Sequence, residues 1–149
     1  MSPSLMWTAI RARIGTRRMR RSTFLELLVP KAQLEGADRD ALARELGALC
    51  GRDLADSPPI VMKQVRAMAR HDHWERLGEL AGTPTLVMSA EHDRIAPPRY
   101  GRALAAAIPG ARYVEIAGAG HVAPIREADE VNALLLDHLA GATESRLAG

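Results

Sequence analysis

Two short apolar runs in the last third of the chain, residues 85–88 and 113–116, predict strands. The segment between them predicts a helix that opens at Pro97 and stops at Gly110, because proline is tolerated in a first helical turn and glycine ends one. The apolar positions of this helix recur at helical spacing and are Gly101, Leu104, Ala105 and Ile108. A strand, a helix and a second strand of this length predict a parallel crossover unit, in which both strands end at one edge of the sheet.

A final helix follows the second strand, and Gly141 is the stop that the pattern predicts for it. Its predicted buried face consists of Ile125, Val131, Leu134, Leu135 and Leu139. Residues 82–149 therefore predict an α/β arrangement, a small parallel sheet with flanking helices.

The N-terminal half predicts helices. Thr23 has the spacing of a capping box with Glu26, and Pro30 ends that helix. Asp38 caps the second helix, which Gly51 follows. The apolar stripe of this second helix consists of Leu42, Leu46 and Leu49, and we expect it to be buried.

A third helix starts after Ser57, and a fourth, short one spans Trp74–Leu80. The third helix has an apolar stripe that we also expect to be buried, formed by Val61, Val65 and Met68. Before all of these helices, Leu5–Thr8 is a candidate strand. The sequence thus divides into residues 1–81, a candidate edge strand and a helical block, and residues 82–149.

The candidate chemistry lies in the two loops that follow the predicted strands. Asp93 follows the first strand, and His121 follows the second after a glycine-rich turn. An imidazole takes and returns a proton near neutral pH, and a neighbouring carboxylate fixes its tautomer. We therefore expect Asp93 and His121 to lie within hydrogen-bonding distance as an acid–base pair, with Glu91 as the fallback acid.

These loops carry a family resemblance. The stretch from Thr83 to Ile95, then Ala107 to Ala111, then Gly118 to His121 resembles the C-terminal end of the α/β-hydrolase superfamily. The resemblance implies a partial α/β-hydrolase fold, preceded by a helical cap in residues 1–81. It also implies that Asp93 is the acid and His121 the base of a catalytic triad.

The same resemblance identifies what this sequence lacks. No serine stands in a G-x-S-x-G turn, so the nucleophile, a serine or an aspartate, is expected outside this chain. We expect the chain alone to be inactive and to require an N-terminal hydrolase half, with self-association or poor solubility as the other outcomes. The substrate would be a small molecule with an ester or related bond. We expect no cofactor and no metal.

Composition and charge set broad limits. Hydrophobic residues make up 47% and charged residues 26%, which fits a folded globular protein. The single cysteine, Cys50, excludes an internal disulfide, and we expect it to be buried as a small hydrophobe on a helix. The first residues lack the basic start of a signal peptide, and no apolar run has the length of a membrane span. We therefore expect a cytoplasmic protein without membrane partners.

Six arginines and no acidic residue occur in residues 11–21, and this basic block is one candidate for nucleic-acid or lipid binding. We favour a solvated helix face, because no aromatic residues for base stacking accompany the block. His71 and His73 are too few for a zinc site and predict a polar hinge between helices. His92 is expected to be exposed, and His138 to be a structural residue of the last helix.

Three hypotheses stay open at this point. The chain supplies the acid and base of a hydrolase; it is a non-catalytic piece from a truncated or split gene that acts only with a partner chain; or it is a binding module that uses the basic block.

Overall fold

The computed structural model of the chain describes residue 7 and residues 14–56 and 58–147. These residues form two compact units, one ending at His73 and the other beginning at Trp74. The division at residues 81 and 82 and the role of the helical part as a cap stay predictions. Apart from Trp7, the candidate strand Leu5–Thr8 lies outside the described residues.

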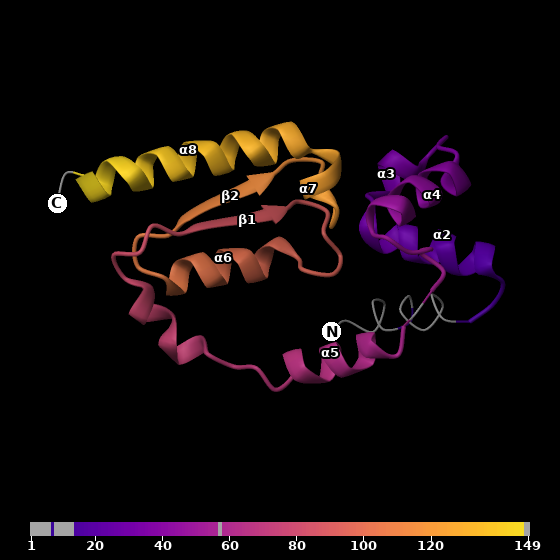
Figure 1. Cartoon of the computed structure of the whole chain (residues 1–149), viewed down its shortest axis with the longest axis horizontal. Coiled ribbons are helices and arrows are strands. Elements are labelled where there is room, and N and C mark those ends of the chain that lie inside the picture. Colours follow the sequence, from indigo (N-terminus) through magenta and orange to yellow (C-terminus); the bar gives the residue numbers. More distant parts are fainter. Residues whose placement is uncertain (1–6, 8–13, 57, 148–149) are drawn as a thin grey trace. The chain divides into compact units, whose positions relative to one another are not determined.

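The N-terminal unit is helical (Figure 1). Its helices are α2 (Arg17–Leu28), α3 (Lys31–Leu34), α4 (Arg39–Leu49) and α5 (Ile60–Met68). Helices α2 and α4 pack against each other, and Leu25 and Leu46 are completely buried in this unit.

The first helix begins earlier than the capping-box pattern predicts. Its N-cap is Thr16, whose side chain accepts the backbone N–H of Met19 at 3.3 Å. Gly15 precedes this cap with φ +102°, a conformation that suits glycine and turns the chain into the helix. Thr23 is therefore a buried residue inside α2, so the prediction that it caps the helix was wrong. The expected end before Pro30 is confirmed, because Val29 is the C-cap.

Asp38 caps α4 as predicted. Its side chain accepts the N–H groups of Asp40 and Ala41, each at 3.0 Å, which satisfies two of the donors that a helix start leaves unpaired. Gly51 follows the helix with φ +67°, the left-handed conformation typical of a residue just beyond a helix end.

Burial in this unit differs from the apolar stripes predicted from the sequence. Leu46 is buried, whereas Leu49 is 61% exposed, and Ala43 and Gly47 occupy the other buried places of α4. No residue of α5 is buried, and Cys50 is exposed. Helical spacing predicts which residues share a face, but burial also needs an element that packs against that face.

The C-terminal unit contains the parallel crossover that the sequence predicts (Figure 1). A 3₁₀ helix, η1 (Trp74–Leu80), precedes β1 (Leu86–Ala90), α6 (Pro98–Ala107) and β2 (Arg112–Ile116). The strands pair in parallel from Leu86 opposite Arg112 to Ala90 opposite Ile116. Among the described residues, this sheet has two strands.

Helices cover both faces of this small sheet. Helix α6 packs against β1 and β2 on one face, and α8 (Ala128–Leu147), preceded by the short α7 (Ala123–Arg126), lies along the other (Figure 1). The core beneath α8 is formed by Ala90, Ile116, Ala119, Ala123 and Val131. Four of these residues lie in or next to the loops that follow the strands, so packing fixes the loops as well as the sheet.

The last helix does not stop at Gly141. Helix α8 continues to Leu147, since an isolated glycine inside a helix costs only about 1 kcal/mol relative to alanine. Its predicted face is buried at Val131, but Leu135 and Leu139 are 39% and 60% exposed. None of the described helices is both long enough and apolar enough to span a membrane.

Candidate acid–base site at the ends of the strands

Asp93 lies in the loop that leaves the C-terminal end of β1. One of its oxygens, Oδ1, accepts the N–H groups of Ile95 at 2.7 Å and of Ala96 at 2.8 Å. A side chain that accepts two N–H groups from the following residues closes a local turn, which fixes the direction of the carboxylate. The second oxygen, Oδ2, is thereby held toward the neighbouring loop.

His121 lies in the loop that leaves the C-terminal end of β2. Gly118 has φ +66°, which lets this loop turn sharply after the strand. The Nδ1 atom of His121 lies 2.8 Å from Oδ2 of Asp93. The two residues are 28 positions apart in sequence, and the expected contact at one edge of a parallel sheet is confirmed. Their catalytic roles stay predictions.

The two side chains differ in exposure. The Asp93 side chain is 9% exposed and the His121 side chain 37% exposed. A largely buried carboxylate favours a ring tautomer in which Nδ1 carries the proton and donates it to the carboxylate. In that tautomer Nε2 has the free lone pair and can accept a proton from a neighbouring group.

A pocket of about 430 Å³ adjoins this pair. Asp93 and His121 line it together with apolar side chains from the sheet and the surrounding helices, among them Met88, Leu104, Ile116 and Val131. An apolar hollow with a few polar groups is the usual form of a small-molecule site. The arrangement can therefore hold an uncharged organic group beside a proton acceptor.

Ser89 also lines this pocket, but its hydroxyl is packed against α6. A Cβ atom placed on Gly101 would come within 2.1 Å of Ser89 Oγ, so the serine occupies the space that this glycine leaves open. The hydroxyl also bonds with Tyr113, whose pKa is raised mainly by burial and further by its bond to Glu115. Ser89 thus serves the contact between helix and sheet, which does not suit a nucleophile.

Glu91, the fallback acid, binds elsewhere. Its Oε2 atom accepts the backbone N–H of Gly118 at 2.8 Å, in the loop that carries His121. Sequence reasoning missed this contact, and a single sequence offers no pattern that would reveal a side chain bonded to a backbone amide 27 positions away. His92, as predicted, is exposed.

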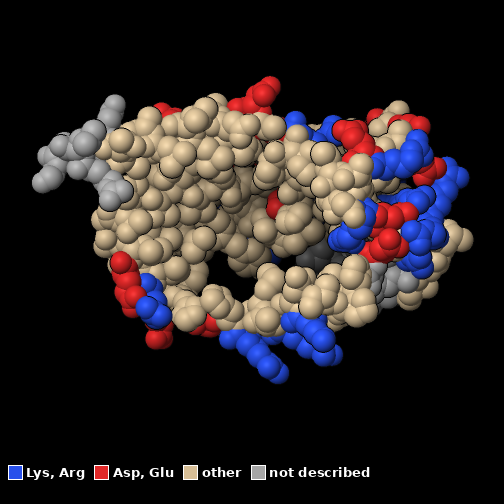
Figure 2. Space-filling view, viewed as in Figure 1, with Lys and Arg blue, Asp and Glu red and all other residues tan. Residues whose placement is uncertain are grey.

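The arginine block has a structural role that the sequence did not indicate. Arg21 Nε lies 2.8 Å from Asp53 Oδ1, and Arg17 lies 2.8 Å from Asp53 and 3.0 Å from Asp56. Arg18 pairs with Asp40 at 3.1 Å. Figure 2 shows the two signs of charge intermixed over α2 and α4, at the right of the view. The arginines tie α2 to an acidic loop within their own unit.

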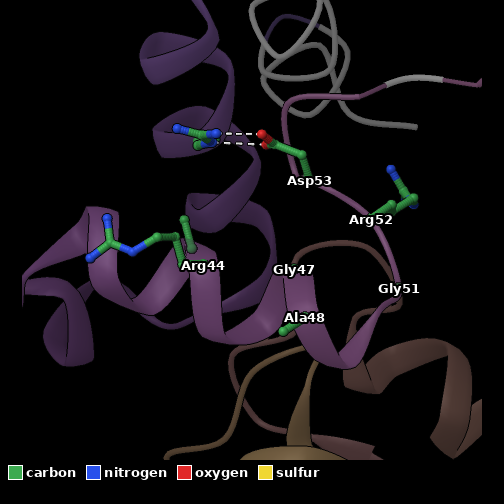
Figure 3. A pocket seen from close by; sticks show the side chains of 8 residues that line it. Arg44, Gly47, Ala48, Gly51, Arg52 and Asp53 are labelled. Atoms are coloured by element: carbon green, nitrogen blue, oxygen red, sulfur yellow. Dashed lines mark hydrogen bonds and ion pairs between the residues drawn. The ribbon is translucent and has the colours of Figure 1, made fainter.

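Asp53 is the centre of this cluster. The bonds from Arg21, from the Ala55 N–H and from Arg17 hold the pKa of its carboxyl far below the usual range. A shallow pocket of about 330 Å³ lies beside it, lined in part by Arg44, Gly47 and Gly51 (Figure 3). In Figure 3 the Arg44 side chain points away from the Asp53 carboxylate, so Arg44 does not join Arg17 and Arg21 in binding it.

His71, His73 and His138 lie outside the lining of the pocket beside Asp93 and His121. The rings of His71 and His73 lie 4.4 Å apart, edge to face, in the segment between α5 and η1. In the part of the chain that the structure describes, no three His, Cys, Asp or Glu side chains are grouped to hold a metal ion. His138 lies half-buried on α8.

Comparison with known proteins adds a family to this geometry. Residues 20–128, more than half of the chain, match the model of the alpha/beta hydrolase fold family. A candidate carbamate hydrolase, RutD of Klebsiella pneumoniae (strain 342), is 38% identical over 80 residues, which is 54% of this chain and 30% of the relative. Rhodomycin D methylesterase DnrP of Streptomyces peucetius is 43% identical over 61 residues, or 41% of this chain and 20% of the relative.

Among solved structures, the enol-lactonase from Burkholderia xenovorans LB400 superposes with a TM-score of 0.68 and 28% sequence identity. That match covers 94% of this chain and 52% of the enol-lactonase. The chain thus spans about half the length of this solved relative and a smaller share of the two relatives found by sequence.

Proposed function

The chain belongs to the alpha/beta hydrolase fold family, and from this premise we propose that it supplies the acid and the base of a hydrolase acting on an ester or a related carbonyl bond. Asp93 is the acid of this proposal and His121 the base. The single observation that carries it is the 2.8 Å contact between His121 Nδ1 and Asp93 Oδ2 at the edge of the sheet where both strands end.

In this proposal His121 moves protons through Nε2. It takes the proton of the attacking group and later gives it to the leaving group, while Asp93 holds Nδ1–H and stabilises the charged ring that forms between the two steps. If the attacking group is an aspartate, His121 instead activates the water that cleaves the covalent intermediate. The bond type rests on the names of the relatives, which include a methylesterase, a candidate carbamate hydrolase and an enol-lactonase.

The nucleophile comes from a segment outside this chain in our proposal. No serine of the sequence lies in a G-x-S-x-G turn, and Ser89 is engaged with α6 and Tyr113. In the described residues β1 pairs with β2 along one side only, so its other edge is open to a further strand. A parallel strand added there would end at the same edge of the sheet as Asp93 and His121.

The proposal is tested by completing the site. The segment of the enol-lactonase that matches residues 82–149 is replaced by these residues, so that the chimera contains a nucleophile and this chain's acid and base. We expect the chimera to hydrolyse an activated ester such as a p-nitrophenyl ester, and His121→Ala to abolish this activity. The isolated chain should show no hydrolysis above the buffer rate, because a nucleophile and its oxyanion donors are missing.

Two outcomes would contradict the proposal. The first is a chimera that unfolds cooperatively, and is therefore folded, but has no hydrolytic activity. The second is robust turnover by the isolated chain, which would place a nucleophile within it. His138→Ala is the matched control, since it removes a histidine of the same unit that lies outside the pocket lining, and it should retain activity.

A further inference from the structure

We propose that Glu91 is a positioning residue that holds the loop of His121 against the loop of Asp93, an inference that rests on the proposed function of this pair. Glu91 follows β1 directly and precedes Asp93 by two positions. Its carboxylate reaches across to the backbone of the second loop, where Oε2 accepts the Gly118 N–H at 2.8 Å.

Besides the contact of the acid with the base, the hydrogen bonds between the first loop and the end of β2 with its following loop include three that bear on the position of His121. The Glu91 N–H donates to Ile116 O at 3.0 Å, and the His92 N–H donates to Ala119 O at 2.9 Å. Both are backbone bonds that almost any residue can make. The bond from Gly118 to the Glu91 carboxylate is the third, and of the three it alone depends on the identity of a side chain.

The bond between the Gly118 N–H and the Glu91 carboxylate lies at the turn that leads to His121. Gly118 adopts φ +66° at the point where the chain leaves β2, three residues before the histidine. A rotation at this turn would swing the following residues and lengthen the 2.8 Å contact between Nδ1 and Oδ2. Fixing the Gly118 amide therefore fixes the turn from which the imidazole is presented.

Glu91 does not compete with Asp93 for the imidazole. Asp93 accepts the N–H groups of Ile95 and Ala96 through one oxygen and contacts His121 through the other. The Glu91 carboxylate is bonded to Gly118, and its Oε2 atom lies 3.9 Å from Nε2 of the neighbouring His92. The two acids thus have separate tasks, one at the ring and one at the backbone.

The geometry also predicts which substitutions preserve the role. Glutamine keeps an oxygen acceptor at the same distance from its own backbone. Aspartate is one methylene shorter, so its carboxylate no longer reaches the Gly118 N–H. Alanine removes the acceptor. We therefore expect Glu91→Gln to behave like the wild type, and Glu91→Asp to behave like Glu91→Ala.

The test is made on the purified full chain by NMR, without need of activity. In Glu91→Ala and Glu91→Asp, solvent exchange of the Gly118 amide should rise about tenfold, the effect of losing one hydrogen bond. The His121 ring nitrogens should shift from a single Nδ1–H tautomer toward a mixture. Glu91→Gln should restore both signals, and Glu75→Ala, an exposed acid on η1, is the matched control that should change neither.

Unchanged Gly118 exchange and an unchanged His121 tautomer in Glu91→Ala would overturn the positioning role, as would a Glu91→Gln variant that behaves like Glu91→Ala. Thermal unfolding of each variant separates a local loop effect from a loss of fold, and Glu91→Asp supplies the answer if the alanine variant does not fold. If the NMR test overturns the role of Glu91, the proposed roles of Asp93 and His121 are unaffected. If the chimera stays active after His121→Ala, the roles of Asp93 and His121 are overturned, and the contact between Glu91 and Gly118 is unaffected.

Discussion

Asp53 in the N-terminal unit and Asp93 in the C-terminal unit are loop aspartates held in the same way but bonded to different partners. Each accepts the N–H of the residue two positions on, Ala55 at 2.8 Å and Ile95 at 2.7 Å. Each also contacts a side chain from an element far away in sequence. For Asp53 that side chain is an arginine, and for Asp93 it is His121.

The difference between the partners decides what each aspartate can do. A guanidinium stays charged at every physiological pH, so Asp53 and its arginines form a permanent ionic link between α2 and the loop that follows α4. An imidazole gains and loses a proton near neutrality, so Asp93 can support proton transfer by His121. A loop aspartate bonded to a nitrogen-bearing side chain far away in sequence is therefore a structural feature in one unit and a candidate catalytic feature in the other.

The sharpest way to break this comparison is to remove the acid of the candidate site. In the hydrolase chimera, Asp93→Asn should lower kcat by about 10⁴-fold, because an asparagine can donate to Nδ1 and so favours the wrong ring tautomer. Asp137→Asn, by contrast, alters an aspartate of the same segment that pairs with Arg112 instead of a histidine, and it should leave kcat unchanged. Ester hydrolysis under saturating substrate measures both, and a retained kcat in Asp93→Asn would contradict the assignment.

A second prediction asks whether the two aspartates depend on separate cores. Leu46 is completely buried and Leu49, on the same helix, is 61% exposed. Leu46→Ala should lower the free energy of unfolding of the N-terminal unit by about 2–5 kcal/mol, whereas Leu49→Ala should change it by less than about 0.5 kcal/mol. Urea unfolding followed by backbone NMR signals of each unit measures this.

In the same spectra the signals of Asp93 and His121 should stay unchanged in both leucine variants, since the two units have separate cores. A parallel loss of the His121 signals in Leu46→Ala would show that the acid–base pair depends on the helical unit.

The third and smallest effect concerns the pH dependence of stability. The pKa of Asp53 is lowered in the folded chain by Arg21, the Ala55 N–H and Arg17. In the unfolded chain the Asp53 carboxylate is protonated at about pH 3.9. The contribution of ionised Asp53 to the stability of the N-terminal unit is therefore complete above about pH 4. It is lost as the pH falls from there toward the lower pKa of the folded chain.

Asp53→Asn should accordingly flatten the loss of stability of the N-terminal unit between about pH 4 and about pH 2. Urea midpoints across this range provide the measurement, with Glu35→Gln, an exposed acid of the same unit, as the control. A pH profile identical to that of the wild type would show that the ionic link contributes nothing to folding.

The sequence predicted the parts of the molecule that depend on local pattern. Residues 85–88 and 113–116 predicted both strands, and Pro97 and Gly110 predicted the limits of the helix between them. Parallel pairing then brought Asp93 to His121, because strands joined by such a crossover end at the same edge. The candidate site could thus be located from a few turn residues and from the spacing of apolar residues in the two strands and the helix between them.

The sequence failed where the outcome depends on tertiary contacts. Thr23 has the spacing of a helix cap, but Thr16 after Gly15 starts the helix earlier. Gly141 is a plausible stop, yet α8 continues past it. Cys50 and two of the three stripe residues of α5, Val65 and Met68, are exposed although helical spacing predicted a buried face. The bonds of Glu91 to Gly118 and of Arg21 to Asp53 join positions far apart, which no local pattern encodes.

The central claim is that Asp93 holds His121 with Nε2 free to accept a proton, and the ring tautomer of His121 tests it most directly. A long-range ¹H–¹⁵N spectrum of the purified chain at about pH 9, where an ordinary imidazole is neutral, distinguishes the two tautomers. We expect a proton on Nδ1 in the wild type and a shift toward Nε2–H in Asp93→Asn. A wild-type ring protonated on Nε2, or a tautomer that Asp93→Asn leaves unchanged, would contradict it.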